Sequence, residues 1–166
     1  SLTWILSITP SNGTASIDVS TGMLTYAPTS NYAGSDSLTV SVGDATFSVS
    51  QEVNLTVTPV NDDPVFSSGS TYSVNEGAST VTTLSASDPD VDILTFSLSG
   101  GVDQSLFALE SSSGALTFLM APSFANPTDH DADNQYHLIA TVSDGSSSFT
   151  QGIVISVLEV EATMEN

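Results

Sequence analysis

The stretch YHLIATVSDG at residues 136–145 decides the fold class of this chain. Apolar and polar side chains alternate over its first part, which is the period of a β-strand with one buried face. The apolar face consists of Tyr136, Leu138, Ala140 and Val142. His137 lies on the opposite face, and Asp144 followed by glycine is a turn signal. The stretch therefore predicts a half-buried strand closed by a turn.

The same alternation recurs along the chain, and no segment keeps a helical period for long. The other segments predicted to be strands are 1–4, 38–42, 53–57, 81–86, 94–98, 116–120 and 153–158. They are rich in Thr, Val, Leu and Phe, which are typical of half-buried strands. Many short strands separated by turns predict an all-β protein of the sandwich type.

The charge balance excludes several classes of partner. The 166 residues include 19 Asp and Glu but no Lys or Arg, which gives a formal net charge of −19. Because no cation is present to neutralise phosphate groups, we expect no binding to nucleic acid and no membrane insertion. A hydrophobic fraction of 39% argues against a disordered acidic chain. A compact fold with this charge favours bound cations, and the absence of Cys leaves metal ions as the available cross-links.

The chain contains an internal repeat whose second copy is longer. Two motifs recur at an offset of 92, namely LTW at 2–4 with LTF at 94–96, and GMLTY at 22–26 with GALTF at 114–118. The motif TVS recurs at 39–41 and 141–143, where the offset is 102. The second copy is therefore predicted to gain about ten residues around 127–136, a stretch rich in carboxylates.

A proline-bounded seam, TPVNDDPVF at residues 58–66, predicts two repeats, 1–60 and 61–166. The first repeat lacks a counterpart of residues 64–92, which should hold two strands. We therefore expect residues 1–60 to be a partial repeat and the chain to come from the interior of a longer polypeptide. The exposed sheet of a partial repeat should be covered by a second chain or by an added extended segment.

Three groups of acidic residues carry the functional signal. The sequence DPDVD at 88–92 places a carboxylate at every second position, and DHDADN at 129–134 repeats that spacing. The third group is scattered and consists of Asn61, Asp62, Asp63, Glu76, Asp144, Glu159 and Glu161. Several carboxylates converging from one loop suit Ca²⁺, which takes six to eight oxygen ligands. The loops lack the glycine and final glutamate of an EF-hand, so that motif is rejected.

Four of these motifs resemble a known family. VNDDPVF at 60–66 resembles the cadherin inter-repeat linker, and NEG at 75–77 the early glutamate motif. ASDPD at 86–90 resembles the Asp-x-Asp motif, and VSDG at 142–145 the late single-aspartate motif. Residues 61–162 are similar to bacterial cadherin-like repeats of large surface and secreted proteins, and residues 1–60 to the later part of such a repeat.

The resemblance implies tandem Greek-key β-sandwiches that bind Ca²⁺, and it implies the metal ligands. These are Asn61, Asp62, Asp63, Glu76, Asp88, Asp90, Asp92, Asp129, Asp131, Asp133, Asp144 and Glu159. It places the linker, the 88–92 loop and Asp144 at one end of the second sandwich. Glu76, the 129–133 loop and Glu159 fall at the other end. The linker departs from the family at Pro59, which stands in place of an aspartate, so we expect one or two ions at the joint.

The function that follows is an extracellular adhesion or spacer segment in which Ca²⁺ rigidifies the joint between successive repeats. Its partners would be neighbouring repeats of a longer chain, with another copy of the chain as an alternative. A different class, a carbohydrate-binding module, would use Trp4, Tyr26 and Phe47 as a stacking platform. No enzyme is predicted, because the chain has neither a nucleophile elbow nor a Cys. His130 is expected to be a polar loop residue, since hard cations prefer oxygen ligands.

Overall fold

The computed structural model describes residues 1–161, and the chain forms two compact units, Ser1–Val60 (unit 1) and Asn61–Asn166 (unit 2). The last five residues of the predicted second repeat lie outside the described part. No helix among the described residues is long and apolar enough to cross a membrane.

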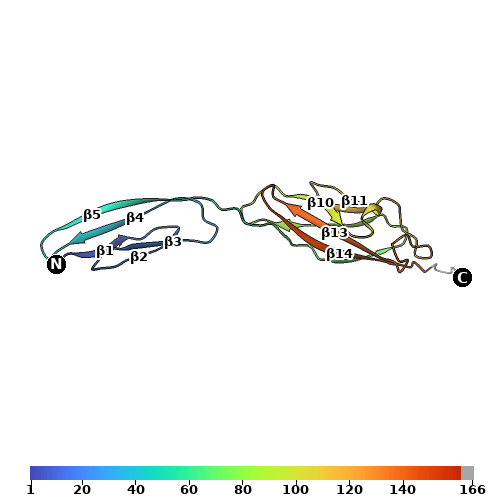
Figure 1. Ribbon diagram of the computed structural model, residues 1–166, viewed down its shortest axis with the longest axis horizontal. Coiled ribbons are helices and arrows are strands. Elements are labelled where there is room, and N and C mark those ends of the chain that lie inside the picture. Colours follow the sequence, from blue (N-terminus) through green and yellow to red (C-terminus); the bar gives the residue numbers. More distant parts are fainter. Residues whose placement is uncertain (162–166) are drawn as a thin grey trace. The chain divides into compact units, whose positions relative to one another are not determined.

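Unit 1 consists of two small antiparallel sheets (Figure 1). Its strands are β1 (Thr3–Ile8), β2 (Gly13–Ile17), β3 (Leu24–Pro28), β4 (Gly34–Gly43) and β5 (Ser48–Val57). One sheet has the order β1-β4-β5 and the other pairs β2 with β3. In this arrangement β5 is an edge strand on one sheet, and β3 has a partner on one side alone.

Unit 2 has the same arrangement with additional strands. The strands are β6 (Val65–Phe66), β7 (Thr71–Asn75), β8 (Thr80–Thr83), β9 (Ala86–Ser87), β10 (Thr95–Gly100), β11 (Phe107–Leu109), β12 (Ala115–Phe118), β13 (Gln135–Ser143) and β14 (Ser148–Leu158), with a 3₁₀ helix at Gln104–Leu106. One sheet has the order β10-β13-β14-β7, the other β11-β12-β8, and β6 pairs with β9. The fold class predicted from the alternating pattern is confirmed.

One turn shows that the two units are built alike. In unit 1 the Asp18 Oδ1 accepts hydrogen bonds from the backbone N–H of Ser20 at 3.0 Å and of Thr21 at 2.7 Å. In unit 2 the Glu110 Oε2 accepts from the N–H of Ser112 at 3.0 Å and of Ser113 at 2.7 Å. The turn therefore repeats at the offset of 92 that the sequence gives.

The structural register corrects the second offset of the repeat. Trp4 pairs with Val42, and its counterpart Phe96 pairs with Val142. Val42 therefore corresponds to Val142, which is an offset of 100 rather than the 102 inferred from the shared TVS motif. The inserted segment is eight residues long instead of ten. The two TVS motifs are identical in sequence but lie two residues apart in the structural register, because Thr and Ser are common in these strands.

The predicted strand at 81–86 is wrong as one element. β8 ends at Thr83 and β9 begins at Ala86. Between them Leu84 is buried and donates its N–H to the Gly114 carbonyl oxygen at 2.8 Å. The chain therefore leaves one sheet at this point and joins another.

The apolar core is concentrated in unit 2. Its buried members are Val74, Leu84, Phe96, Phe107, Leu116, Phe118, Tyr136, Leu138, Ala140, Val142, Ile153, Ile155 and Val157. Tyr136 packs edge-on against Phe118 at 5.1 Å between ring centroids, a favourable aromatic geometry. In unit 1 Leu38 and Pro10 are buried, while the other apolar side chains are half-buried or exposed. The rigid scaffold for a site is therefore unit 2.

Candidate metal centres in unit 2

The first acidic loop, residues 88–92, joins β9 to β10. Carboxylate oxygens of Asp88, Asp90 and Asp92 lie within 4.8 Å of one another. The Asp88 Oδ1 accepts hydrogen bonds from the N–H of Asp90 at 2.8 Å and of Asp92 at 3.4 Å, which folds the loop back on itself. The other oxygen, Asp88 Oδ2, is buried and has no hydrogen-bond partner.

The start of unit 2 lies against this loop. Asp62 donates its backbone N–H to the Asp90 Oδ2 at 2.7 Å. Asn61 donates its side-chain amide to the Asp144 Oδ2 at 2.9 Å. The structure therefore brings together residues 61–62, the first acidic loop and Asp144, which sequence reasoning placed at one end of the second sandwich.

Asp144 is held in the tight turn between β13 and β14. Its Oδ1 accepts from the N–H of Ser146 and of Ser147, both at 2.6 Å. The hydrogen bond from the Ser147 N–H lowers the pKa of Asp144 well below its ordinary value, and the Asn61 amide lowers it further. The carboxylate is therefore ionised and held in position by hydrogen bonds from the turn.

The second acidic loop, residues 129–133, precedes β13. Carboxylate oxygens of Asp129, Asp131 and Asp133 again lie within 4.8 Å of one another. The Asp129 side chain is 6% exposed, and its Oδ2 accepts from the Asp133 N–H at 2.8 Å. The Asp129 Oδ1 is buried without a hydrogen-bond partner.

Glu76 and Asn134 connect the second acidic loop to the rest of its end of the unit. Glu76 Oε2 accepts from the Phe124 N–H at 3.1 Å, and Glu76 Oε1 accepts from the Val160 N–H at 3.2 Å. Asn134 donates its amide to the Phe124 carbonyl at 3.1 Å. The Asn134 Oδ1 is buried and unpartnered, like the Asp129 Oδ1. Phe124 therefore connects Glu76 to Asn134, which directly follows the second acidic loop.

The two acidic loops share one design. In each, the first aspartate accepts the N–H of the residue four positions on and leaves its second oxygen buried and unpartnered. In each, the fourth residue has left-handed backbone, with φ of 64° at Val91 and 58° at Ala132. A non-glycine residue there is strained, most of all a β-branched one. An orphaned buried carboxylate oxygen is costly, and a hard cation is the partner that would satisfy it.

Two predicted ligands are not brought into these clusters. Asp63 and Glu159 are exposed, and neither side chain forms a hydrogen bond to another described residue of the clusters. Asp63 precedes the buried Pro64, and Glu159 follows the end of β14. Their ligand roles stay predictions.

Sequence reasoning missed the buried carboxylate of Asp103. This side chain is 2% exposed, and it accepts from the N–H of His130 at 2.8 Å and of His137 at 2.7 Å. It thereby fixes the backbone directly after Asp129. Asp103 stands alone in the sequence, without the alternate-position spacing that marked the other acids, so no pattern singled it out.

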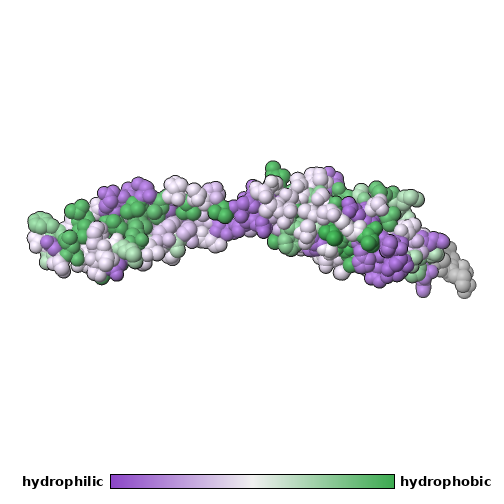
Figure 2. Space-filling model, in the orientation of Figure 1, coloured by the Kyte–Doolittle hydropathy of each residue, from purple (hydrophilic) through white to green (hydrophobic). Residues whose placement is uncertain are grey.

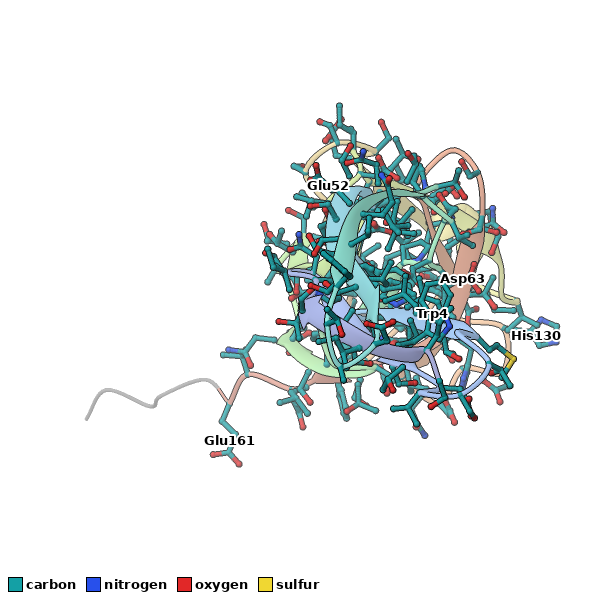
Figure 3. All side chains as sticks on the ribbon, turned by 90° about the vertical axis from the view of Figure 1, so that its left-hand side faces the viewer. Trp4, Glu52, Asp63, His130 and Glu161 are labelled. Carbon is teal, nitrogen blue, oxygen red and sulfur yellow. The ribbon has the colours of Figure 1, made fainter. Side chains whose placement is uncertain are left out.

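The aromatic platform proposed for carbohydrate does not form. The Trp4 ring is half-buried over Gly22, and the Tyr26 hydroxyl donates to the Asp36 Oδ2 at 3.0 Å. Phe47 is the one exposed member of the three. Packing against Gly22 and Gly13 takes up the rings of Trp4 and Tyr26. His130 projects outward from unit 2 and away from its strands, as a polar loop residue does (Figure 3).

Sequence comparisons find two kinds of similar protein. A family described as Bacterial Ig domain matches residues 1–58. The human Cadherin EGF LAG seven-pass G-type receptor 1 is 39% identical over 124 residues, which cover 70% of this chain. The human receptor 2 of the same name is 33% identical over 123 residues. The chain spans 4% of the length of each of these relatives.

Solved structures of cadherin domains share the fold. The crystal structure of human Protocadherin-24 EC1-2 Form II has a TM-score of 0.65 and 22% identity, covering 96% of this chain and 82% of that chain. Drosophila N-cadherin EC1-3 has a TM-score of 0.54 and 17% identity, covering 96% of this chain and 55% of that chain. The chain has a cadherin-like fold. Its Greek-key sandwich is that of cadherin extracellular domains, as the motif resemblance implied.

The comparisons decide some of the functional expectations for this cadherin-like chain. The relatives are receptors and cadherin domains, so the expectation of a non-enzymatic chain is confirmed. A carbohydrate-binding module is not supported by these relatives. The bacterial assignment is not confirmed, because the cadherin relatives are animal proteins, although residues 1–58 match a bacterial family.

Proposed function

We propose that this chain is an extracellular, calcium-binding adhesion or spacer segment of a cell-surface protein. The observation that supports it is the orphaned oxygen in each acidic loop. Asp88 Oδ2 and Asp129 Oδ1 are buried without partners, each beside two further carboxylates. No Lys or Arg exists in the chain to neutralise them. A divalent cation in each loop would satisfy the orphaned oxygen and remove the repulsion among its neighbours.

The donor set favours Ca²⁺ over Mg²⁺ and over transition metals. All the donors are carboxylate, amide or backbone oxygens, which exclude soft metals as the preferred ions. The backbone of Asp62 contacts the first acidic loop, and Asn61 connects Asp144 to Asp62, so the Asp62 and Asp144 carboxylates are further candidate ligands at this end. Such a set approaches the six to eight oxygens that Ca²⁺ takes, whereas Mg²⁺ keeps several waters in a small octahedral site.

The function we assign to the first acidic loop is mechanical. The loop lies where the chain enters unit 2. Asp62, which contacts the loop, comes two residues after Val60, the last residue of unit 1. Calcium would lock the linker residues onto the loop and make successive repeats move as one body. Without the ion, the carboxylates repel one another, and the hydrogen bonds of Asn61 and Asp62 are left to hold the linker residues in place. Neighbouring repeats of a longer chain are the partners in this proposal.

Small-angle X-ray scattering of the full chain tests the mechanical function. Adding calcium should narrow the distribution of interatomic distances of the wild type. The double variant Asp88→Ala/Asp90→Ala should keep, in calcium, the broader distribution of the calcium-free wild type. The matched control is Asp131→Ala/Asp133→Ala, which removes the same charge from the second acidic loop. Calcium should still narrow the distribution of the control. Identical scattering of the wild type with calcium and with EDTA would contradict the stiffening role.

A further inference from the structure

The buried carboxylate of Asp103 holds both ends of the segment that carries the second acidic loop. Its side chain is 2% exposed, and each of its oxygens accepts one backbone hydrogen bond. Oδ1 accepts from the N–H of His130, which directly follows Asp129, and Oδ2 accepts from the N–H of His137 in β13. Residues 131–136, with two of the three carboxylates of the loop, lie between these attachment points. One side chain therefore fixes the backbone on both sides of them.

The backbone that carries Asp103 is itself fixed against β13. Gly101 has left-handed backbone, with φ of 99°, and a Cβ atom there would lie 2.3 Å from the His137 carbonyl oxygen and 2.5 Å from the Leu138 Cα. Only glycine allows so close an approach of two backbones. Asp103 also donates its own N–H to the His137 carbonyl oxygen at 3.3 Å. The carboxylate is therefore presented to the loop from a backbone with little room to move.

Unit 1 has a buried carboxylate at the same place, but it comes from the other side. Asp103 corresponds to Ser11 at the offset of 92. Asp36 of β4 is 7% exposed, and it accepts hydrogen bonds from the N–H of Ser11 at 3.0 Å and of Asn12 at 2.9 Å. In unit 1 the strand carboxylate thus binds the connection after β1, whereas in unit 2 the connection supplies the carboxylate. From that side it reaches both β13 and the inserted acidic segment.

The segment held in this way carries the orphaned oxygen of the second acidic loop. Asp129 is 6% exposed and its Oδ1 is buried without a partner, while carboxylate oxygens of Asp129, Asp131 and Asp133 lie within 4.8 Å of one another. Figure 2 shows hydrophilic side chains gathered at the end of unit 2 toward the C-terminus, which is the end where β13 begins (Figure 1). Asp103 is not a member of this group of oxygens, because backbone donors occupy both of its own.

We propose that Asp103 is a positioning residue for the calcium ion of the second acidic loop. This inference rests on the proposed binding of calcium there. Asp103 orders the backbone around the ligands before the ion arrives, so little conformational entropy is lost on binding. When its acceptor oxygens are removed, the ion itself has to order the segment, and calcium affinity falls. The first acidic loop is closed by its own hydrogen bonds and keeps its affinity.

Calcium titration of the full chain by isothermal calorimetry tests the proposal, with each loop measured in the absence of the other. The Asp88→Asn background reports binding at the second loop, and the Asp129→Asn background reports binding at the first. Adding Asp103→Asn should weaken calcium binding at the second loop about 10–100-fold and leave binding at the first unchanged. The matched control is Asp36→Asn, which alters a similarly buried carboxylate in unit 1 and should leave both affinities unchanged.

Amide hydrogen exchange on the wild type makes a second test that needs no substitution. Calcium should slow exchange at His130 and His137, whose N–H groups donate to Asp103, because ion binding and these hydrogen bonds stabilise each other. This measurement decides the question if Asp103→Asn does not fold.

The outcomes separate this inference from the proposed function. Unchanged affinity of the second loop in Asp103→Asn would overturn the positioning role and leave calcium binding intact. Equal weakening at both loops would also overturn it, because it would indicate a general structural role in unit 2. So would exchange at His130 and His137 that ignores calcium in a wild type that binds at both loops. A wild type without calcium at the second loop would overturn the proposed binding there and this inference with it.

Discussion

Leu24 and Leu116 occupy the same place in the two units, yet Leu116 is fully buried and Leu24 is half-exposed. The strand pairings around them are the same, with Leu24 opposite Ile17 and Leu116 opposite Leu109. The difference is β8, which covers Leu116 and has no counterpart beside Leu24 among residues 1–161. Local sequence thus determines the strand and the turn, while burial depends on whether the neighbouring strand is present.

Truncating these two leucines should give the largest contrast between the units. Leu116→Ala leaves a cavity in a closed core and should cost about 2–5 kcal/mol of the stability of unit 2. Leu24→Ala removes a side chain that is partly in water and should cost unit 1 about 1 kcal/mol. Native-state hydrogen exchange, read separately on β13 and β4, measures both values. Equal losses in the two units would show that unit 1 is as well packed as unit 2.

Calcium removal should give the next largest contrast, which is in the thermal stability of the two units. Both triads of carboxylates are in unit 2, so EDTA should destabilise unit 2 and leave unit 1 unchanged. An ion present at a hundredfold excess over its Kd contributes about 2.7 kcal/mol per site to the folded state. Differential scanning calorimetry should show one transition that moves with calcium and one that does not. A calcium-dependent shift of both transitions would contradict the assignment of the sites to unit 2 alone.

Adding a methyl group at the two equivalent turn glycines sharpens the comparison. Gly22 and Gly114 both have left-handed backbone, with φ of 74° and 72°, so alanine costs about 1–2 kcal/mol at either. At Gly114 the new methyl group also meets the backbone carbonyl of Leu84, which cannot move aside. At Gly22 it meets the Trp4 side chain. We expect Gly114→Ala to lower the unfolding midpoint in urea more than Gly22→Ala, and the reverse order would show that the Leu84 backbone can move aside.

The smallest expected effect is on stability at acidic pH. Hydrogen bonds from Ser112 and Ser113 lower the pKa of Glu110 from 4.5 to about 2. A lowered folded-state pKa contributes stability that is complete above the unfolded value and is lost as the pH falls. Between pH 4.5 and 2 the wild type should therefore lose this contribution, whereas Glu110→Gln should lack that part of its pH dependence. Urea midpoints at pH 5 and pH 3 (about the middle of that range) measure it. Asp18→Asn is the control, since its pKa is also lowered, but in unit 1.

Much of the fold could be predicted from the sequence because alternation is a local property. Six of the strands assigned after residue 37 overlap strands of the structure, from β4 to β14, and the segment 81–86 divides between β8 and β9. The short strands β2, β3, β6, β7 and β11 were missed, and in β2 and β7 the reason is that Gly13 and Asn75 at their ends favour turns. The register of β4 was also missed, because repeated Thr, Val and Ser letters fit two alignments equally well.

Of the residues at the candidate sites, some could be predicted from the sequence and others could not. The 88–92 and 129–133 loops could be found because alternate carboxylates are a local pattern. Asp103 could not be found, since its role depends on the distant His130 and His137 backbone. Asn134 follows the second loop directly, yet its buried amide oxygen is evident only once Phe124 packs nearby. Contacts made across the fold are the part that no spacing rule reveals.

Calcium titration by isothermal calorimetry tests the central claim most directly. The wild type should bind calcium at both acidic loops, Asp88→Asn should lose the binding at the first loop alone, and Asp129→Asn should lose that at the second. Each substitution keeps the shape of the side chain and removes the charge beside the orphaned oxygen. A wild type that neither releases nor absorbs heat of binding with millimolar calcium would contradict the account, as would variants that titrate like the wild type.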